Sequence, residues 1–261
     1  MAQLTGALQA LQAGSRAPEH PHQARVAIRQ MRVAWALARS TPHTAPPEVL
    51  ETLTGLFKAL GPCRDRDVMA DLLSESLGSG WRAMALGQED LHATTDPRQA
   101  IASAPEVRQA METLHAWLLH IPDDGLSDSR RWRKHLLKRL TRWHQRLLKD
   151  AARFDALDDE AVHAFRKRLK RLRYGLQFAR TCLPGEGIKR YLKVLTPLQT
   201  ALGDFNDAHT ALEHCRRWPA SPDQRTSLAW LHHRQQQARA HSREALQAFM
   251  AQPLPLTSAE G

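Results

Sequence analysis

Apolar residues recur every three or four positions along almost the whole chain, which is the period of an amphipathic α-helix. No segment alternates between apolar and polar residues as a half-buried strand does. The breaks between periodic segments are rich in Pro, Gly, Ser and Asp, which end helices. The pattern predicts an all-α fold with helices at about 3–13, 20–40, 47–60, 65–77, 105–120, 129–153, 159–182, 186–202, 206–218 and 222–250.

The segment 129–153 divides most clearly into two faces. At 100° per residue, its leucines lie on one side of the helix and its cations on the other. Residues 130–149 hold nine Lys or Arg and no acid, so the segment itself offers no carboxylate to pair with them. Considered alone, such a face is equally well explained by a solvated helix surface. The residues assigned to the cationic face are Arg131, Lys134, Lys138 and Arg142.

A different basic pattern occurs twice, 141 positions apart. Each copy has a histidine followed by cations three, seven and ten positions later. On a helix these four side chains fall within about 80° of one another. Like charges on so narrow a strip repel, so folding alone gives little reason to repeat it, whereas a bound polyanion gives a direct one. The first strip is His22, Arg25, Arg29 and Arg32, and the second strip is His163, Arg166, Lys170 and Arg173.

The apolar residues beside each strip place it next to the expected core. In the second copy the apolar set that includes Leu169 lies about 100° from the cations rather than opposite to them. Ile28 holds the equivalent place in the first copy. A strip beside the buried face lines a seam between helices, where partial loss of water strengthens charge interactions. Two such seams from two related halves are expected to line one central basic channel.

A second pair of matched segments supports internal duplication. LGPCRD at residues 60–65 matches LGDFND at residues 202–207, which lies 142 positions later. Leu53, Leu56 and Leu60, the last of which begins the first segment, match Leu195, Leu198 and Leu202 at the same separation. Two matches in the same order and nearly the same register are hard to obtain by chance. We therefore expect two related halves, residues 1–125 and 126–261, joined within the segment IPDDGLSDS.

The net charge indicates an anionic partner for this helical chain. The charge is +10 at neutral pH and the pI is about 10.1. Residues 130–180 hold 17 Lys or Arg against 5 Asp or Glu, so the positive charge is concentrated there. Hydrophobic residues make up 42% of the chain, which is enough for a folded core. The helical periodicity and regular leucines of the basic segment argue against a disordered basic tail.

Cysteine usage and hydropathy favour a reducing compartment away from membranes. The three cysteines show no CxxC spacing and cannot all pair. No run of about 18 or more apolar residues occurs, and the N-terminus lacks the pattern of a secretory signal. We expect a cytoplasmic protein with no membrane partner, and the sequence gives no sign of a cofactor.

The strips and the matched segments together resemble the CHAD domain, a conserved-histidine α-helical domain. HQARVAIRQMR and HAFRKRLKRLRY resemble its two histidine blocks, and LGPCRDRDV and LGDFNDA resemble its two partner motifs, so the likeness covers essentially the whole chain. The resemblance implies two pseudo-symmetric four-helix-bundle repeats around a central basic cavity. It also implies binding of inorganic polyphosphate and recruitment to polyphosphate granules. Some members carry a fused triphosphate-cleaving domain, for which this chain has no room, so it resembles the stand-alone form.

The cations of the two strips suit phosphate chemically. Arginine presents two parallel N–H donors to phosphate oxygens, and lysine supplies a mobile point charge. Ten residues of helix span about 15 Å, which is enough to meet several phosphates of a polymer. The predicted polyphosphate-binding residues are the two strips, the cationic face of 129–153, and Lys189 and Lys193. The alternative is that the cations pair with carboxylates of the chain, namely Asp65, Asp67, Asp204 and Asp207.

The histidines of the strips, His22 and His163, allow three interpretations: metal ligand, phosphate donor or structural residue. No second His or Cys stands at a zinc spacing, so a metal site is not favoured. Neighbouring cations disfavour protonation, which favours a neutral imidazole that donates to phosphate or orients an arginine. Asp65 and Asp207 follow the LG pairs and are expected to cap a helix or hold an arginine rather than bind Mg²⁺.

The sequence favours a binding protein over an enzyme. No phosphate-binding loop and no nucleophile motif is recognisable. Polyphosphate is the favoured partner, with weaker binding of other polyanions. One alternative is a nucleic-acid-binding protein, which is disfavoured because no aromatic residues are interleaved with the cations and the seven Trp are expected mainly in the core. The other alternative is a phosphohydrolase or kinase that processes polyphosphate.

Overall fold

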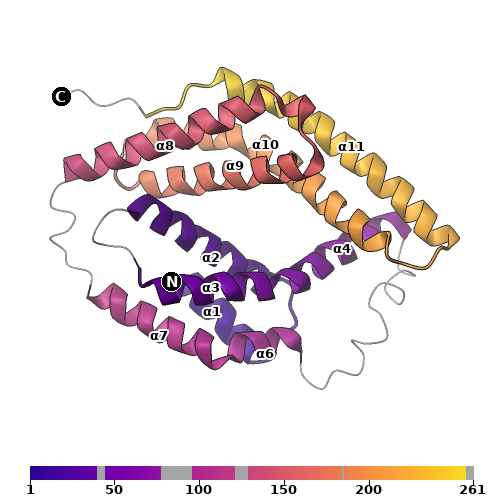
Figure 1. The fold of residues 1–261 in the computed structure, drawn as a ribbon, viewed down its shortest axis with the longest axis horizontal. Coiled ribbons are helices and arrows are strands. Elements are labelled where there is room, and N and C mark those ends of the chain that lie inside the picture. Colours follow the sequence, from indigo (N-terminus) through magenta and orange to yellow (C-terminus); the bar gives the residue numbers. More distant parts are fainter. Residues whose placement is uncertain (40–44, 78–95, 121–128, 184, 257–261) are drawn as a thin grey trace. The chain divides into compact units, whose positions relative to one another are not determined.

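The computed structural model describes residues 1–39, 45–77, 96–120, 129–183 and 185–256. Within these ranges the chain forms helices and no strands, which confirms the all-α fold class. The chain divides into two compact units, Met1–Gly125 and Leu126–Gly261 (Figure 1). No described helix is long and apolar enough to cross a membrane. That the two units are pseudo-symmetric copies around one cavity stays a prediction.

The first unit packs its helices around a leucine-rich core. Helix α1 contacts α2 and α6, and α3 contacts α2 and α7. Leu4, Ile28, Leu53 and Leu114 come from four of these helices and are fully buried in one cluster. Burial of this apolar surface is the main term that holds the helices together. The helices are α1 (Ala2–Gln12), α2 (Glu19–Ala38), α3 (Pro47–Ala59), α4 (Gly61–Leu77), α6 (Pro97–Ser103) and α7 (Pro105–Leu119).

The second unit consists of four longer helices and one short 3-10 turn, Phe154–Ala156, within its described residues (Figure 1). Helix α10 packs along both α9 and α11, and α8 packs on α9 and α11. Asp158 caps α9 by accepting a hydrogen bond from the backbone N–H of Ala161 at 2.8 Å. The helices are α8 (Ser129–Ala151), α9 (Asp159–Ala179), α10 (Gly185–Cys215) and α11 (Pro222–Ala251). The expected apolar face of α9, Phe165, Leu169, Leu172 and Leu176, is fully buried.

Helix α10 differs from the sequence expectation, because the break predicted at the second LG pair does not occur. Residues 186–202 and 206–218 were expected as two helices, but one helix continues through Leu202 and Gly203 as far as Cys215. A helical glycine costs about 0.5–1 kcal/mol relative to alanine. Leu202 is fully buried and Phe205 is 3% exposed, so packing against the neighbouring helices offsets this cost.

The helix that follows the first LG pair also begins earlier than expected. The sequence pattern predicts a start near residue 65, whereas α4 begins at Gly61. Helix α6 lies within residues 78–104, which are less periodic and for which the sequence interpretation is short helices on a loop. In this seven-residue helix Pro97 occupies the first turn, and Asp96 accepts a hydrogen bond from the N–H of Arg98 at 2.9 Å. Most of the weakly periodic segment before it, residues 78–95, and most of the expected junction, residues 121–128, lie outside the described residues.

Close approach of α8 and α9 depends on Gly175. A Cβ atom at this position would lie 2.8 Å from Leu140 Cδ2 and 2.9 Å from Trp143 Cζ3, both on α8. Leu140 is fully buried, so its side chain has no room to move away from an added methyl group. By contrast, a Cβ at Gly203 would meet no atom within 4 Å.

These two glycines give opposite predictions for alanine substitution. Gly175→Ala should lower the free energy of unfolding by about 1–3 kcal/mol, because the added methyl forces α8 and α9 apart. Gly203→Ala should raise it by about 0.5–1 kcal/mol, because alanine favours helix and nothing obstructs it. Urea denaturation followed by circular dichroism measures both changes. Equal effects of the two substitutions would contradict the packing described for α8 and α9.

Candidate anion-binding strips

The first strip lies on α2 and gathers around one aromatic ring. The guanidinium carbons of Arg25, Arg29 and Arg32 lie 4.0, 5.5 and 5.8 Å from the centroid of the Phe57 ring on α3. Arg25 Nη1 also donates a hydrogen bond to the backbone carbonyl of Phe57. Arg25 and Arg29 are half-buried and Arg32 is exposed, so the strip runs from the core to the surface. The contact between α2 and α3 therefore brings together the three cations predicted for this strip.

A glycine makes room for the innermost cation of the first strip. A Cβ at Gly61 would lie 3.1 Å from Arg25 Nη1, which is tighter than an ordinary contact. This glycine belongs to the LGPCRD segment and begins α4. The segment was singled out for its match to the second half, and the structure shows that it lies against the first strip.

The second strip lies on α9 and is held by polar groups of α10. His163 Nδ1 contacts Asn206 Oδ1, and Arg173 Nη1 donates to the side-chain oxygen of Gln199. Arg166 Nη2 lies 3.9 Å from Asp207 Oδ1. Lys170, the fourth member of the strip, is half-buried between these positions on the same helix.

Asp207 fills one of its two expected roles and not the other. It lies inside α10, so the expectation that it caps a helix is wrong, whereas its contact with Arg166 matches the expectation that it holds an arginine. Asp65 likewise lies within α4 rather than at its start. The contact between Arg166 and Asp207 is of the kind that the alternative interpretation, pairing of cations with carboxylates of the chain, predicts. The Asp207 side chain is 36% exposed, so water screens this pair. Asp67 instead forms an ion pair with Arg98, in which Arg98 Nη2 lies 2.7 Å from Asp67 Oδ1.

The imidazole of His163 has a fixed orientation and a lowered pKa. Burial is the main cause of the lowering, and the positive charges of Lys167 and Arg166 add to it, while the contact with Asn206 opposes it. Asn206 Nδ2 donates to Asp207 Oδ1 at 3.3 Å, which leaves Asn206 Oδ1 to accept from His163. The neutral ring therefore donates its one N–H, at Nδ1, to Asn206 Oδ1. A hydrogen bond from Nε2 to a phosphate requires a second proton on the ring.

The lowered pKa of His163 links folding to pH. In the unfolded chain this histidine takes up a proton near pH 6.5, its ordinary pKa, whereas in the folded chain it does so only at lower pH. The unfolded state therefore binds more protons between these two values, and stability falls as the pH drops below 6.5.

The predicted cationic face of α8 is on the surface. Leu136, Leu140 and Leu147 are buried as expected. All four cations assigned to the opposite face, Arg131, Lys134, Lys138 and Arg142, are exposed. Lys189 and Lys193 are exposed near the start of α10, where Lys189 Nζ lies 4.0 Å from Glu186. An anion in solvent can reach the exposed side chains of Lys134, Lys138, Arg142 and Lys193.

Sequence reasoning missed a group of arginines between α8 and α9. The Arg171 guanidinium lies over the Trp143 ring, 4.1 Å from its centroid. Burial, and then the nearby charges of Arg139 and Arg146, lower the pKa of Arg171. The signal was present in the sequence, since Arg139 and Arg146 lie on one side of α8 at i and i+7. It was hidden because they belong to the same dense run of cations as the residues assigned to the outer face.

The aromatic residues contradict two sequence expectations. Among the described tryptophans only Trp35 is buried, so the expectation that most lie in the core is wrong. Trp143 and Trp230 instead lie half-exposed beneath Arg171 and Arg234. Aromatic rings therefore do lie among the cations. The packing of α8 on α9 places Trp143 beneath Arg171, whereas Trp230 and Arg234 are four residues apart on α11.

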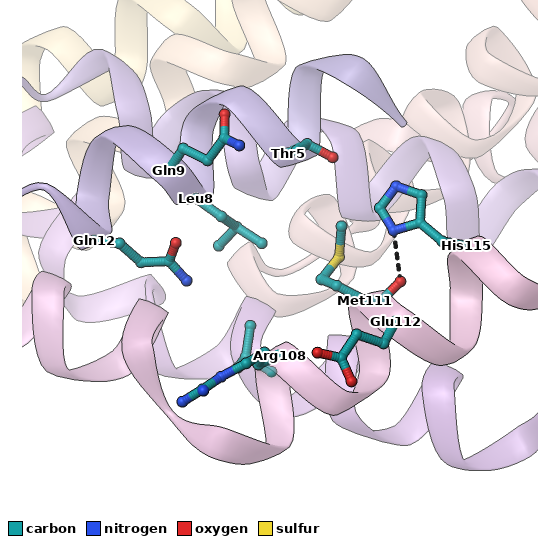
Figure 2. A pocket seen from close by; sticks show the side chains of 9 residues that line it. Thr5, Leu8, Gln9, Gln12, Arg108, Met111, Glu112 and His115 are labelled. Atoms are coloured by element: carbon teal, nitrogen blue, oxygen red, sulfur yellow. Dashed lines mark hydrogen bonds between the residues drawn. The ribbon is translucent and has the colours of Figure 1, made fainter.

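A cleft of about 240 Å³ lies elsewhere, between α1 and α7 of the first unit (Figure 2). Leu8, Val107 and Met111 give it an apolar lining, and Arg108 and Glu112 lie at its rim (Figure 2). It contains no residue of either strip. Among the described residues, no group of three His, Cys, Asp or Glu is arranged to hold a metal ion.

Comparison with known proteins places these features in a family. Residues 1–216 match the model of the CHAD domain. The crystal structure of the CHAD domain from the plant Ricinus communis is similar to this chain, with a TM-score of 0.68 and 28% sequence identity. The match covers 95% of this chain and 90% of the plant protein's chain. No curated protein sequence matches the chain.

The contact between His163 and Asn206 leads to a prediction on the histidine pKa. Asn206→Asp should raise the pKa of His163, because a carboxylate at the same place stabilises the imidazolium. An NMR titration of the His163 ring protons measures the change, with the exposed His233 as an internal control that should not move. An unchanged His163 titration in this variant would show that the described contact does not exist in solution.

Proposed function

Because the chain belongs to the CHAD domain family, we propose that it binds inorganic polyphosphate through the two strips and does not process it chemically. The observation that carries the proposal is the way the cations are held. Within the described residues, Arg29 and Arg32 lie against the Phe57 ring, and Arg173 is bonded to the Gln199 amide. These partners are neutral, so the cations are positioned without losing their charge.

The geometry of the strips matches a polymer better than a single phosphate. Each strip runs along about 15 Å of helix, with cations at intervals of three and four residues. Half-burial of Arg25, Arg29, Lys170 and Arg173 reduces screening by water and salt, which strengthens contacts with an anion. The exposed cations of α8, together with Lys189 and Lys193, extend the basic surface outward. In this proposal the inner strips bind first and the outer cations meet the remainder of a long chain.

Binding without turnover is the second part of the proposal. It is supported by the sequence, in which no phosphate-binding loop or nucleophile motif was found. Incubation with polyphosphate and Mg²⁺, assayed for released phosphate, tests it directly. A protein that only binds a cytoplasmic polymer is expected to gather where that polymer accumulates, so we also propose association with polyphosphate granules.

A nucleic acid is the second candidate partner, because the structure places aromatic rings among the cations. Phe57 lies beside three arginines and Trp143 beside Arg171, and aromatic rings stack on unpaired bases in single-stranded sites. Both rings, however, already carry an arginine about 4 Å from their centroids, which occupies one face of each ring. Polyphosphate needs no stacking surface and therefore fits the strips better.

The proposal predicts the salt dependence and the selectivity of binding. Fluorescence anisotropy with labelled polyphosphate of defined length should give a log affinity that falls linearly with log salt, because several cations release counterions. Unlabelled polyphosphate should compete far better than single-stranded or duplex DNA of equal charge. Equal competition by single-stranded DNA would favour the nucleic-acid alternative, and an affinity independent of salt would contradict the electrostatic account.

Substitutions in both strips give a second prediction. Arg29→Ala and Lys170→Ala should each weaken binding by about tenfold, and the double variant should bind more weakly than either. Thermal stability should stay nearly constant or rise, because like charges are removed. Arg225→Ala, which removes an exposed cation of α11, serves as the control and should bind normally. Unfolding of the double variant would show that these residues are structural.

A further inference from the structure

One residue outside both strips contacts three cations of the first. The Phe57 ring lies within 4.0–5.8 Å of the guanidinium carbons of Arg25, Arg29 and Arg32, and its backbone carbonyl accepts from Arg25. Phe57 comes from α3, whereas the arginines come from three successive turns of α2. The side chain is half-exposed, and it packs against the core of the first unit as well as against the arginines.

The face of an aromatic ring suits a group of like charges. It carries partial negative charge that attracts guanidinium groups, but it has no formal charge that would cancel theirs. A carboxylate in the same place would hold the arginines more tightly and would also compete with an incoming anion. The ring thus limits the freedom of three long side chains without itself cancelling their charge.

In the second half, the residue at the matching position contacts the strip through a hydrogen bond instead of an aromatic ring. Phe57 corresponds to Gln199 at the separation of 142 that aligns the leucines of the two halves. Gln199 accepts from Arg173, which is the counterpart of Arg32. The same position of the helix that follows each strip therefore contacts the strip in both halves. In the first half that contact is aromatic and reaches three cations.

We propose that Phe57 is a positioning residue of the polyphosphate site: its ring holds Arg25, Arg29 and Arg32 as one array for the phosphates. The inference rests on the proposed function, since it assigns a role within that binding site. Ordering these side chains before binding lowers the entropy lost when the polymer binds. Phe57 itself contributes no charge, so it should affect affinity without changing the number of counterions released.

The test compares variants of Phe57 by polyphosphate titration over a range of salt concentrations. Phe57→Leu keeps an apolar side chain but removes the ring, and it should weaken binding about tenfold with an unchanged salt slope. Phe57→Tyr keeps the ring and should bind within about twofold of the wild type. Phe178→Leu removes another exposed phenylalanine, from α9, and should have no effect.

A second variant keeps the test decisive if Phe57→Leu unfolds. Pentafluorophenylalanine at position 57 preserves the shape of the ring but reverses the sign of charge on its face, so it should weaken binding while the protein stays folded. Wild-type affinity for both the leucine and the pentafluoro variants would overturn the inference. The proposed function fails separately: in that case the wild-type chain itself shows no salt-dependent binding of polyphosphate.

Discussion

Repulsion between like charges on one helix face is the constraint on which the rest of this structure depends. Each strip places its cations on successive turns, beside the apolar face that the helix buries. Such an arrangement disfavours folding, more so where water is partly excluded. Neutral groups contact several of these cations: an aromatic ring and a backbone carbonyl in the first strip, and a side-chain amide at Arg173 in the second. The chain thereby keeps an excess of positive charge that a bound polyanion would stabilise.

The packing of the helices explains why the strips occupy these places. Fully buried residues such as Ile28 in α2 and Leu169 in α9 fix the rotation of each helix about its axis. The cations lie to one side of that buried face and meet the next long helix, α3 in the first unit and α10 in the second. Gly61 then lets the start of α4 approach Arg25 closely. The strips are thus held by the core itself, rather than by flexible loops.

Much of this arrangement could be predicted from the sequence, because it depends on local periodicity. The spacing of leucines and cations predicts the helices and the buried face of α9. It also predicts that the four residues of each strip lie on one helix. The roles of Phe57, Gln199 and Asn206 could not be predicted, because they arise from contacts between residues on different helices that are 25 or more positions apart in the chain. The continuity of α10 was missed for a related reason: burial of Leu202 and Phe205 outweighs the local preference of glycine for a break.

The central claim is that polyphosphate occupies the two strips rather than the basic surface in general. Chemical modification of arginines with phenylglyoxal, read residue by residue by mass spectrometry with and without polyphosphate, tests it most directly. The account predicts strong protection of Arg29, Arg32, Arg166 and Arg173, and little protection of the exposed Arg217 and Arg225. Uniform protection of all exposed arginines, or protection confined to residues outside the strips, would contradict it.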